Sequence, residues 1–164
     1  MPGNPAALMT KVVAAFAPML HSVQTGGFLL LLIAVSVCDL KRREIPDGLQ
    51  LAIGMLTFLC FSPINLLGIL GALPYLAVAL FFYSGNGIGG GDIKLAAATG
   101  MVLGLPASLV SSMLGLSLFM VYGTVQTHIL RRHGQDGKIP FPVGPFLAAG
   151  SAAACFMKMG GIIR

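Results

Sequence analysis

Long apolar runs separated by short polar segments dominate the pattern of this chain. Two of them, Ile64–Tyr83 and Leu109–Ile129, reach the roughly 20 apolar residues that a membrane-spanning helix needs. Val23–Cys38 is nearly as long and carries no charge. Three further runs are shorter or interrupted, namely Leu49–Phe61, Ile93–Leu105 and Gly144–Ile163. The pattern predicts an all-α fold, a polytopic membrane helical bundle with about six transmembrane helices.

The amino-terminal segment shows a weaker apolar pattern. Lys11 precedes the apolar run Val12–Leu20, but no small-x-small cleavage site of a secretory signal follows it. Residues 7–22 are therefore expected to form either an interfacial helix or an extension of the first span. We interpret residues 1–164 as a single membrane domain.

Composition supports the membrane assignment. Hydrophobic residues make up 56% of the chain, charged residues only 9%, and the mean hydropathy is +0.90. Soluble domains carry about 25% charged residues, so this chain has too few charges to cover itself with a solvated surface and needs a lipid bilayer. There is no Trp and no interleaving of aromatic with basic residues, so a nucleic-acid partner is not expected.

The few charges are placed unevenly. Seven of the ten basic residues fall in the first, third and fifth predicted loops: Lys41, Arg42, Arg43, Lys94, Arg131, Arg132 and Lys138. With six spans, these loops share one face, which the positive-inside rule assigns to the cytoplasm. We expect a multi-pass protein of the cell inner (plasma) membrane with both termini outside. All five carboxylates lie on the same cytoplasmic side, so any acid–base chemistry is expected there.

Two aspartates stand at predicted membrane boundaries. An ionisable residue within the membrane costs about 2.5–3.5 kcal/mol on insertion scales and usually has a function. Asp39 directly follows an apolar run at the end of the first helix, where the helix dipole disfavours an anion. Asp92 begins the fourth helix, where a purely structural role as a helix cap is an alternative.

The surroundings of Asp92 favour function. Five glycines occur in residues 84–91, and such a segment suits an extended substrate strand beside a carboxylate, a flexible linker or an anion-binding nest. Asp92, Ala96, Gly100 and Gly104 recur every four residues. This spacing predicts that Asp92 lies on a helix-packing face rather than on a lipid-facing one.

Two motifs together resemble the prepilin peptidase family. Residues 39–47, Asp-Leu-Lys-Arg-Arg-Glu-Ile-Pro-Asp, resemble the family's motif of an aspartate, a basic loop and Ile-Pro, although Asp47 stands where Asn is common. Residues 89–95, Gly-Gly-Gly-Asp-Ile-Lys-Leu, resemble its Gly-x-Gly-Asp motif. Ile139-Pro140-Phe141 and Gly144-Pro145-Phe146 resemble the start of the family's last helix. The loop after Asp39 is short and has no Cys pair, as in the Tad-type or preflagellin-type branch without the methyltransferase loop.

The resemblance implies an aspartic endopeptidase that removes the leader peptide from type IV or Tad-type prepilins, at a Gly before an apolar helix. Asp39 and Asp92 are the expected catalytic pair, and Gly89, Gly90, Gly91 and Lys94 the expected substrate-binding residues. Lys94 could equally pair with Asp92 or serve only as a membrane anchor. Two carboxylates that share a site separate their proton affinities. From the dipoles of their own helices, Asp39 is expected to hold the shared proton and Asp92 to be ionised.

No cofactor or metal is expected. Cys38, Cys60 and Cys155 form no Cys-x-x-Cys pair, and the three histidines are far apart in sequence. Two other functions remain open. Membrane-level acids and glycine-broken helices also occur in small transporter or channel subunits, and a non-catalytic pilus or secretion assembly subunit is a further alternative.

Overall fold

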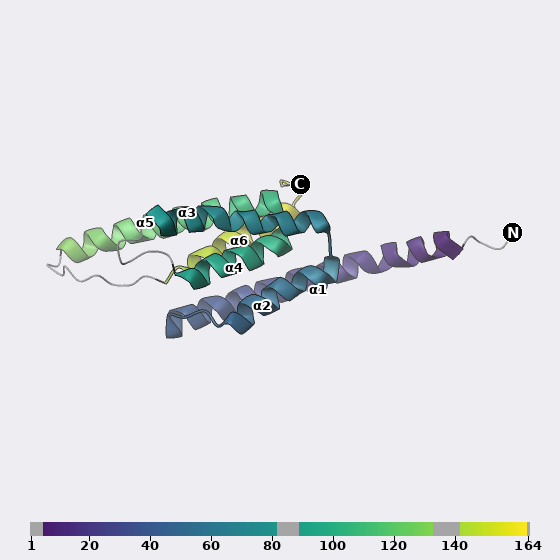
Figure 1. Ribbon diagram of the computed structural model, residues 1–164, viewed down its shortest axis with the longest axis horizontal. Helices are drawn as coiled ribbons and strands as arrows, with labels where there is room; N and C mark the ends of the chain where they lie inside the picture. The colour runs from purple at the N-terminus through teal and green to yellow at the C-terminus, as the bar shows by residue number, and fades with distance from the viewer. Residues whose placement is uncertain (1–4, 82–88, 133–141, 164) are drawn as a thin grey trace.

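The computed structural model describes residues 5–81, 89–132 and 142–163, and all regular structure within these ranges is helical. Six helical segments confirm the predicted all-α class (Figure 1). Their bounds are α1 Pro5–Arg42, α2 Asp47–Met55 continued by the 3₁₀ segment η1 Leu56–Cys60, η2 Pro63–Ala72 in 3₁₀ geometry continued by α3 Leu73–Phe81, α4 Gly90–Leu103, α5 Leu105–Arg132 and α6 Gly144–Met159.

Among the residues that the structure describes, three helices are long and apolar enough to cross a membrane. They are Ala15–Arg42, Pro63–Phe81 and Leu105–Leu130. The apolar helix Asp47–Cys60 is shorter, and α4 and α6 have 14 and 16 residues. These three correspond to the shorter runs of the sequence pattern.

Helix α1 runs without interruption from Pro5 to Arg42 and includes Pro18. Residues 7–22 therefore continue the first helix without a break. Figure 1 shows the amino-terminal part of α1 reaching beyond the other helices.

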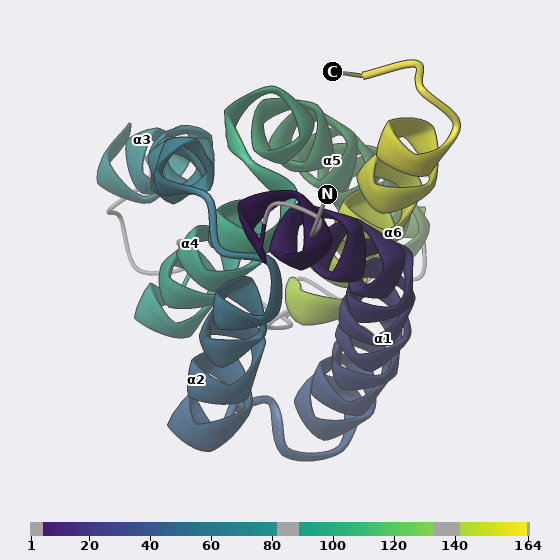
Figure 2. The ribbon, with the colours of Figure 1, turned by 90° about the vertical axis from the view of Figure 1, so that its right-hand side faces the viewer.

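Helix α4 is the centre of the bundle. It packs against α2, η2, α5 and α6, and Figure 2 shows it between α2 and α3. The predicted small-residue face is confirmed, because Asp92, Ala96, Gly100 and Gly104 are all buried. A Cβ on Gly100 would collide with the carbonyl oxygen of Gly68, so the backbones of α4 and η2 touch directly.

Most of the charged residues that the structure describes gather at one end of the bundle. Lys41, Arg42, Arg43 and Lys94 lie at one end, which we call the basic end, where α1 finishes and α4 and α6 begin. At the opposite end α4 turns into α5 through Gly104, whose φ of 80° favours glycine. Both aspartates singled out in the sequence lie at the basic end.

Candidate active site

Asp39 is held in the last turn of α1 and is 5% exposed. Its Oδ2 accepts a hydrogen bond of 2.9 Å from the backbone N–H of Gly144, the first residue of α6. A Cβ on Gly144 would lie 2.7 Å from that oxygen, so only glycine permits this approach. The amide and the α6 dipole favour negative charge on Asp39, in opposition to the dipole of its own helix.

Asp92 is the third residue of α4 and is 8% exposed. Its Oδ2 accepts a hydrogen bond of 3.2 Å from the N–H of Gly89, while its own N–H donates to the Gly89 carbonyl at 3.0 Å. This closed turn fixes the carboxyl at the helix start, so Asp92 does act as a cap. Capping alone does not require burial, which is costly for a carboxylate.

The two aspartates line one pocket, of about 580 Å³, at the basic end. Its other lining residues come from the α1–α2 connection and the start of α4: Arg42, Arg43, Glu44, Ile45, Pro46, Asp47, Gly89 and Gly91. The fold thus brings together two carboxyls that are 53 positions apart in the chain. A pocket of this size admits a short stretch of polypeptide together with water.

Burial changes the acid–base properties of Asp92. Desolvation and the nearby charge of Asp39 raise the pKa of Asp92 to about 6, against a smaller lowering by the Gly89 N–H. The expectation that Asp92 is the ionised member rested on helix dipoles alone, and desolvation acts against it. Desolvation changes the pKa of Asp92 more than the dipole of α4 does. Asp39 accepts a hydrogen bond from the backbone amide of Gly144 in α6, a contact that the sequence of its own helix does not reveal. The geometry favours Asp92 as the proton holder and Asp39 as the carboxylate.

Only two of the four expected substrate-binding residues line the pocket. Gly89 and Gly91 line the pocket, whereas Gly90 and Lys94 are exposed beside it. Lys94 Nζ lies 3.2 Å from Asp47 Oδ1, in a solvent-exposed ion pair. Lys94 therefore pairs with Asp47 and not with Asp92, which was one of the expected alternatives. The remainder of the glycine-rich segment, 84–88, lies outside the described residues, as does Ile139-Pro140-Phe141.

Gln50 is a site residue that the sequence reasoning missed. It is 6% exposed, and its Nε2 donates to the carbonyls of Ile45 at 3.4 Å and Gly91 at 3.3 Å. It therefore ties the α1–α2 connection to the start of α4 and holds two walls of the pocket together. The signal that the sequence offered was the single polar side chain of Gln50 near the start of the apolar run Leu49–Phe61.

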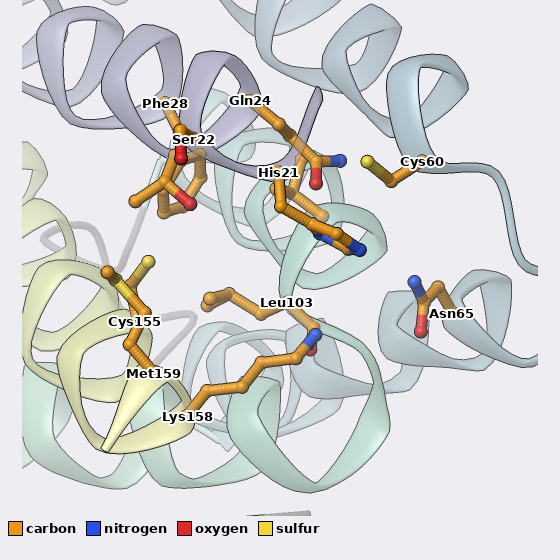
Figure 3. A pocket seen from close by; sticks show the side chains of 12 residues that line it. His21, Ser22, Gln24, Phe28, Cys60, Asn65, Leu103, Cys155, Lys158 and Met159 are labelled. Carbon is orange, nitrogen blue, oxygen red and sulfur yellow. The ribbon is translucent and has the colours of Figure 1, made fainter. Parts of the chain in front are cut away.

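A second cavity, of about 300 Å³, lies at the opposite end of the bundle (Figure 3). Figure 3 shows Lys158 reaching across to Leu103, with His21 and Asn65 on the other side. Lys158 Nζ donates to the Leu103 carbonyl at 2.6 Å, so it caps the carboxyl end of α4. The lining residues of this cavity include neither aspartate.

The chemistry that the pocket supports is acid–base catalysis by two carboxyls. Within residues 5–81, 89–132 and 142–163, no group of three or more His, Cys, Asp or Glu side chains is placed to hold a metal ion. One carboxylate can accept a proton from water while the other, protonated, donates to a carbonyl oxygen. That arrangement suits hydrolysis of a peptide bond.

Comparison with known proteins agrees with the motifs. Residues 27–124 match the model of the type IV leader peptidase family, and this range contains both aspartates. The chain is 32% identical over 169 aligned residues to a prepilin leader peptidase/N-methyltransferase of Burkholderia pseudomallei (strain 1026b), which covers 92% of this chain and 51% of that protein.

Two further relatives carry the same name. The protein from Bacillus subtilis (strain 168) is 35% identical over 136 residues, covering 77% of this chain and 52% of the relative. The one from Aeromonas hydrophila is 33% identical over 158 residues, covering 87% and 52%. The chain thus spans about half the length of the curated relatives it matches. No solved structure matches the chain.

Proposed function

Because the chain belongs to the type IV leader peptidase family, we propose that it is a membrane aspartyl endopeptidase that removes the leader peptide from prepilins. The observation that carries the proposal is the shared pocket of Asp39 and Asp92, two carboxyls that are 5% and 8% exposed. Burying two acids at one pocket costs free energy, and an acid–base reaction gives a reason for it.

The proposed reaction begins with a water molecule between the two carboxyls. The Asp39 carboxylate accepts a proton from this water, and the water oxygen attacks the carbonyl carbon of the scissile peptide bond. The protonated Asp92 carboxyl donates its proton to the carbonyl oxygen, giving a neutral tetrahedral intermediate. Collapse of the intermediate breaks the C–N bond as the proton held by Asp39 passes to the leaving amine, while one hydroxyl of the intermediate returns its proton to the Asp92 carboxylate, which leaves a carboxylic acid product and restores both side chains.

The proposed substrate path follows the start of α4. Gly89, Gly90 and Gly91 carry no side chains, so an extended peptide can approach their backbone closely. Lys94 stands beside this segment in an exposed ion pair with Asp47. An acidic or carbonyl group of the substrate can replace Asp47 as its partner, since exposed ion pairs contribute only about 0–1 kcal/mol.

We place the pocket at the cytoplasmic face. The basic residues Lys41, Arg42, Arg43 and Lys94 surround that end of the bundle, which is the side the positive-inside rule assigns to the cytoplasm. The short α1–α2 connection without a Cys pair supports a substrate of the Tad-type or preflagellin-type class, by resemblance to that branch. The proposal concerns the peptidase reaction alone.

The test is cleavage by the purified chain in detergent or nanodiscs. A prepilin is incubated with it, and the products are identified by mass spectrometry. We expect a single cut immediately before the apolar helix of the prepilin, with no requirement for added metal or nucleotide. A purified, folded chain that leaves several Tad-type and type IV prepilins intact would contradict the proposal. Ion flux through liposomes containing the chain would instead favour the transporter alternative.

A further inference from the structure

Tyr75 carries a buried hydroxyl that no protein group in the described structure pairs with. The side chain lies in α3 and is 1% exposed. Among the residues that the structure describes, the Tyr75 and Thr57 hydroxyls are the two buried side-chain groups without a hydrogen-bond partner. Burying an unpaired hydroxyl destabilises a protein, whereas a Phe ring of the same shape carries no such penalty. The Tyr75 hydroxyl therefore needs a partner, and its surroundings indicate which one.

The bundle leaves room for this hydroxyl between α5 and α6. A Cβ on Gly115 of α5 would collide with the Tyr75 hydroxyl oxygen and would lie 3.3 Å from the Phe146 carbonyl oxygen. The hydroxyl thus occupies the place of a side chain that Gly115 lacks, although Gly inside a helix is less stable than Ala. Phe146 belongs to the first turn of α6. That helix begins at Gly144, the residue whose N–H donates to Asp39.

The same place is level with Asp92 along the bundle. Helices α4 and α5 form an antiparallel hairpin about Gly104, since a Cβ on Gly100 would lie 3.3 Å from the Ser108 Cβ. Asp92 precedes Gly104 by twelve positions and Gly115 follows it by eleven. Both therefore lie about 17 Å along their helices from the turn. Figure 2 shows α3, which carries the hydroxyl, beside α4 and α5.

The Asp92 carboxyl has few polar neighbours on its buried side. Within the described residues, it accepts one hydrogen bond, from the Gly89 N–H at 3.2 Å. The residues around the pocket that can carry charge all come from the end of α1 and the α1–α2 connection: Asp39, Arg42, Arg43, Glu44 and Asp47. Lys94, on the same helix as Asp92, pairs with Asp47. Helices α3, α5 and α6 add no residue to this lining, but the Asp92 charge acts on the Tyr75 hydroxyl.

We propose that Tyr75 is a positioning residue for Asp92, whose carboxyl its hydroxyl reaches through buried water. A hydroxyl can accept a hydrogen bond while the carboxyl is protonated and donate one once the carboxyl is ionised. The bond to the ionised form is the stronger, because the acceptor is charged. Tyr75 therefore stabilises the carboxylate that forms when Asp92 gives up its proton. The gain in catalysis rests on the proposed function, whereas the effect on proton affinity does not.

The first test follows the proton of Asp92 by infrared spectroscopy of the purified chain. The carbonyl stretch of a protonated carboxyl that disappears in Asp92→Asn reports this proton, and its loss is recorded as the pH is raised. For the native chain we expect the midpoint near the pKa of about 6. Tyr75→Phe should move the midpoint upward by about half to one pH unit, since loss of a donor disfavours the carboxylate. Tyr122→Phe is the matched control, because its exposed hydroxyl accepts from Gln126 and lies outside the pocket lining.

Thermal unfolding separates this role from simple packing. If the hydroxyl had no partner, Tyr75→Phe would be neutral or stabilising at every pH. With the proposed hydrogen bond, the variant should melt at a lower temperature than the native chain, and the difference should grow as the pH rises through about 6, where Asp92 becomes ionised. In the Asp92→Asn background this pH dependence should vanish. A difference that is the same at every pH would overturn the inference.

Cleavage of a prepilin adds the kinetic measurement. A carboxyl of higher pKa is a weaker proton donor, so Tyr75→Phe should lower kcat at its optimum pH by up to about tenfold and leave KM unchanged. The alkaline limb of the kcat profile should move upward with the infrared midpoint. An unchanged or lowered infrared midpoint, or an equal shift in Tyr122→Phe, would overturn the inference. If the midpoint moves as expected but the native chain cuts no prepilin, the proposed function fails and the link between Tyr75 and Asp92 stands.

Discussion

Asp92 is buried at the start of α4 in surroundings that penalise its negative charge. Desolvation and the Asp39 charge raise its pKa to about 6, whereas a carboxyl in the unfolded chain titrates near 4. The folded state therefore binds this proton more tightly than the unfolded state. The stability that the bound proton contributes is fully present below the unfolded pKa and is lost as the pH rises through about 6.

Replacement of Asp92 by Asn should remove this pH dependence. Two pKa units correspond to about 3 kcal/mol at most, so between pH 4.5 and 7.5 the native chain should lose up to that much stability relative to Asp92→Asn. Thermal unfolding in detergent at several pH values measures the difference. Asp47→Asn is the control, because Asp47 is exposed. Parallel pH profiles for the native chain and Asp92→Asn would show that Asp92 carries no such penalty.

Individual residues also show where sequence reasoning ends. Asp39 and Asp92 were found because carboxyls are rare beside apolar runs. The partner of Asp39 was not, because Gly144 lies 105 positions away and its role depends on where α6 begins in space. The proton assignment has the same limit, since desolvation depends on packing and the dipole argument considered only each residue's own helix.

At the scale of elements, the packing of α4 against η2 depends on direct contact between their backbones. A Cβ on Gly68 would collide with the carbonyl of Gly100, and the Ser112 hydroxyl donates to the Gly71 carbonyl nearby. In a membrane, where helices gain little from apolar burial, close packing of this kind is a main source of association. It also positions Asp92, which lies two turns before Gly100 on α4.

Gly68→Ala should therefore destabilise the bundle by about 1–3 kcal/mol, since neither backbone can move without disturbing its neighbours. Gly123→Ala is the matched control, because a Cβ there meets nothing within 4 Å. It should be neutral or stabilise α5 by up to about 1 kcal/mol. Thermal unfolding of the two variants in the same detergent makes the comparison, and equal melting temperatures would contradict the packing argument.

At the scale of the whole molecule, the run lengths of the sequence predicted six helical segments because a bilayer fixes how long an apolar segment must be. The runs showed that α4 is short, but they did not reveal that it is central, with protein on most sides. Nor did they reveal that residues 63–72 adopt 3₁₀ geometry. Hydropathy along one segment carries no information about either property.

The orientation of the bundle is open to a labelling test. In a background without Cys38, Cys60 and Cys155, single cysteines replace Gly48 and Pro106, which are exposed at opposite ends. An impermeant maleimide should label position 106 in intact cells and position 48 only from the cytoplasmic side. Labelling of both from one side would break the six-span topology, and the reverse pattern would refute the cytoplasmic placement of the pocket.

The most direct measurement of the central claim is the rate of leader removal from a prepilin by the purified chain and three variants. Asp39→Asn and Asp92→Asn each leave one carboxyl of the pair and should lower kcat by at least about 10³-fold while the protein remains folded. Glu44→Gln is the control, because Glu44 is an exposed carboxylate that lines the same pocket, and its rate should stay within about threefold of the native chain. Near-native cleavage by either aspartate variant would remove that residue from catalysis and contradict the two-carboxyl mechanism.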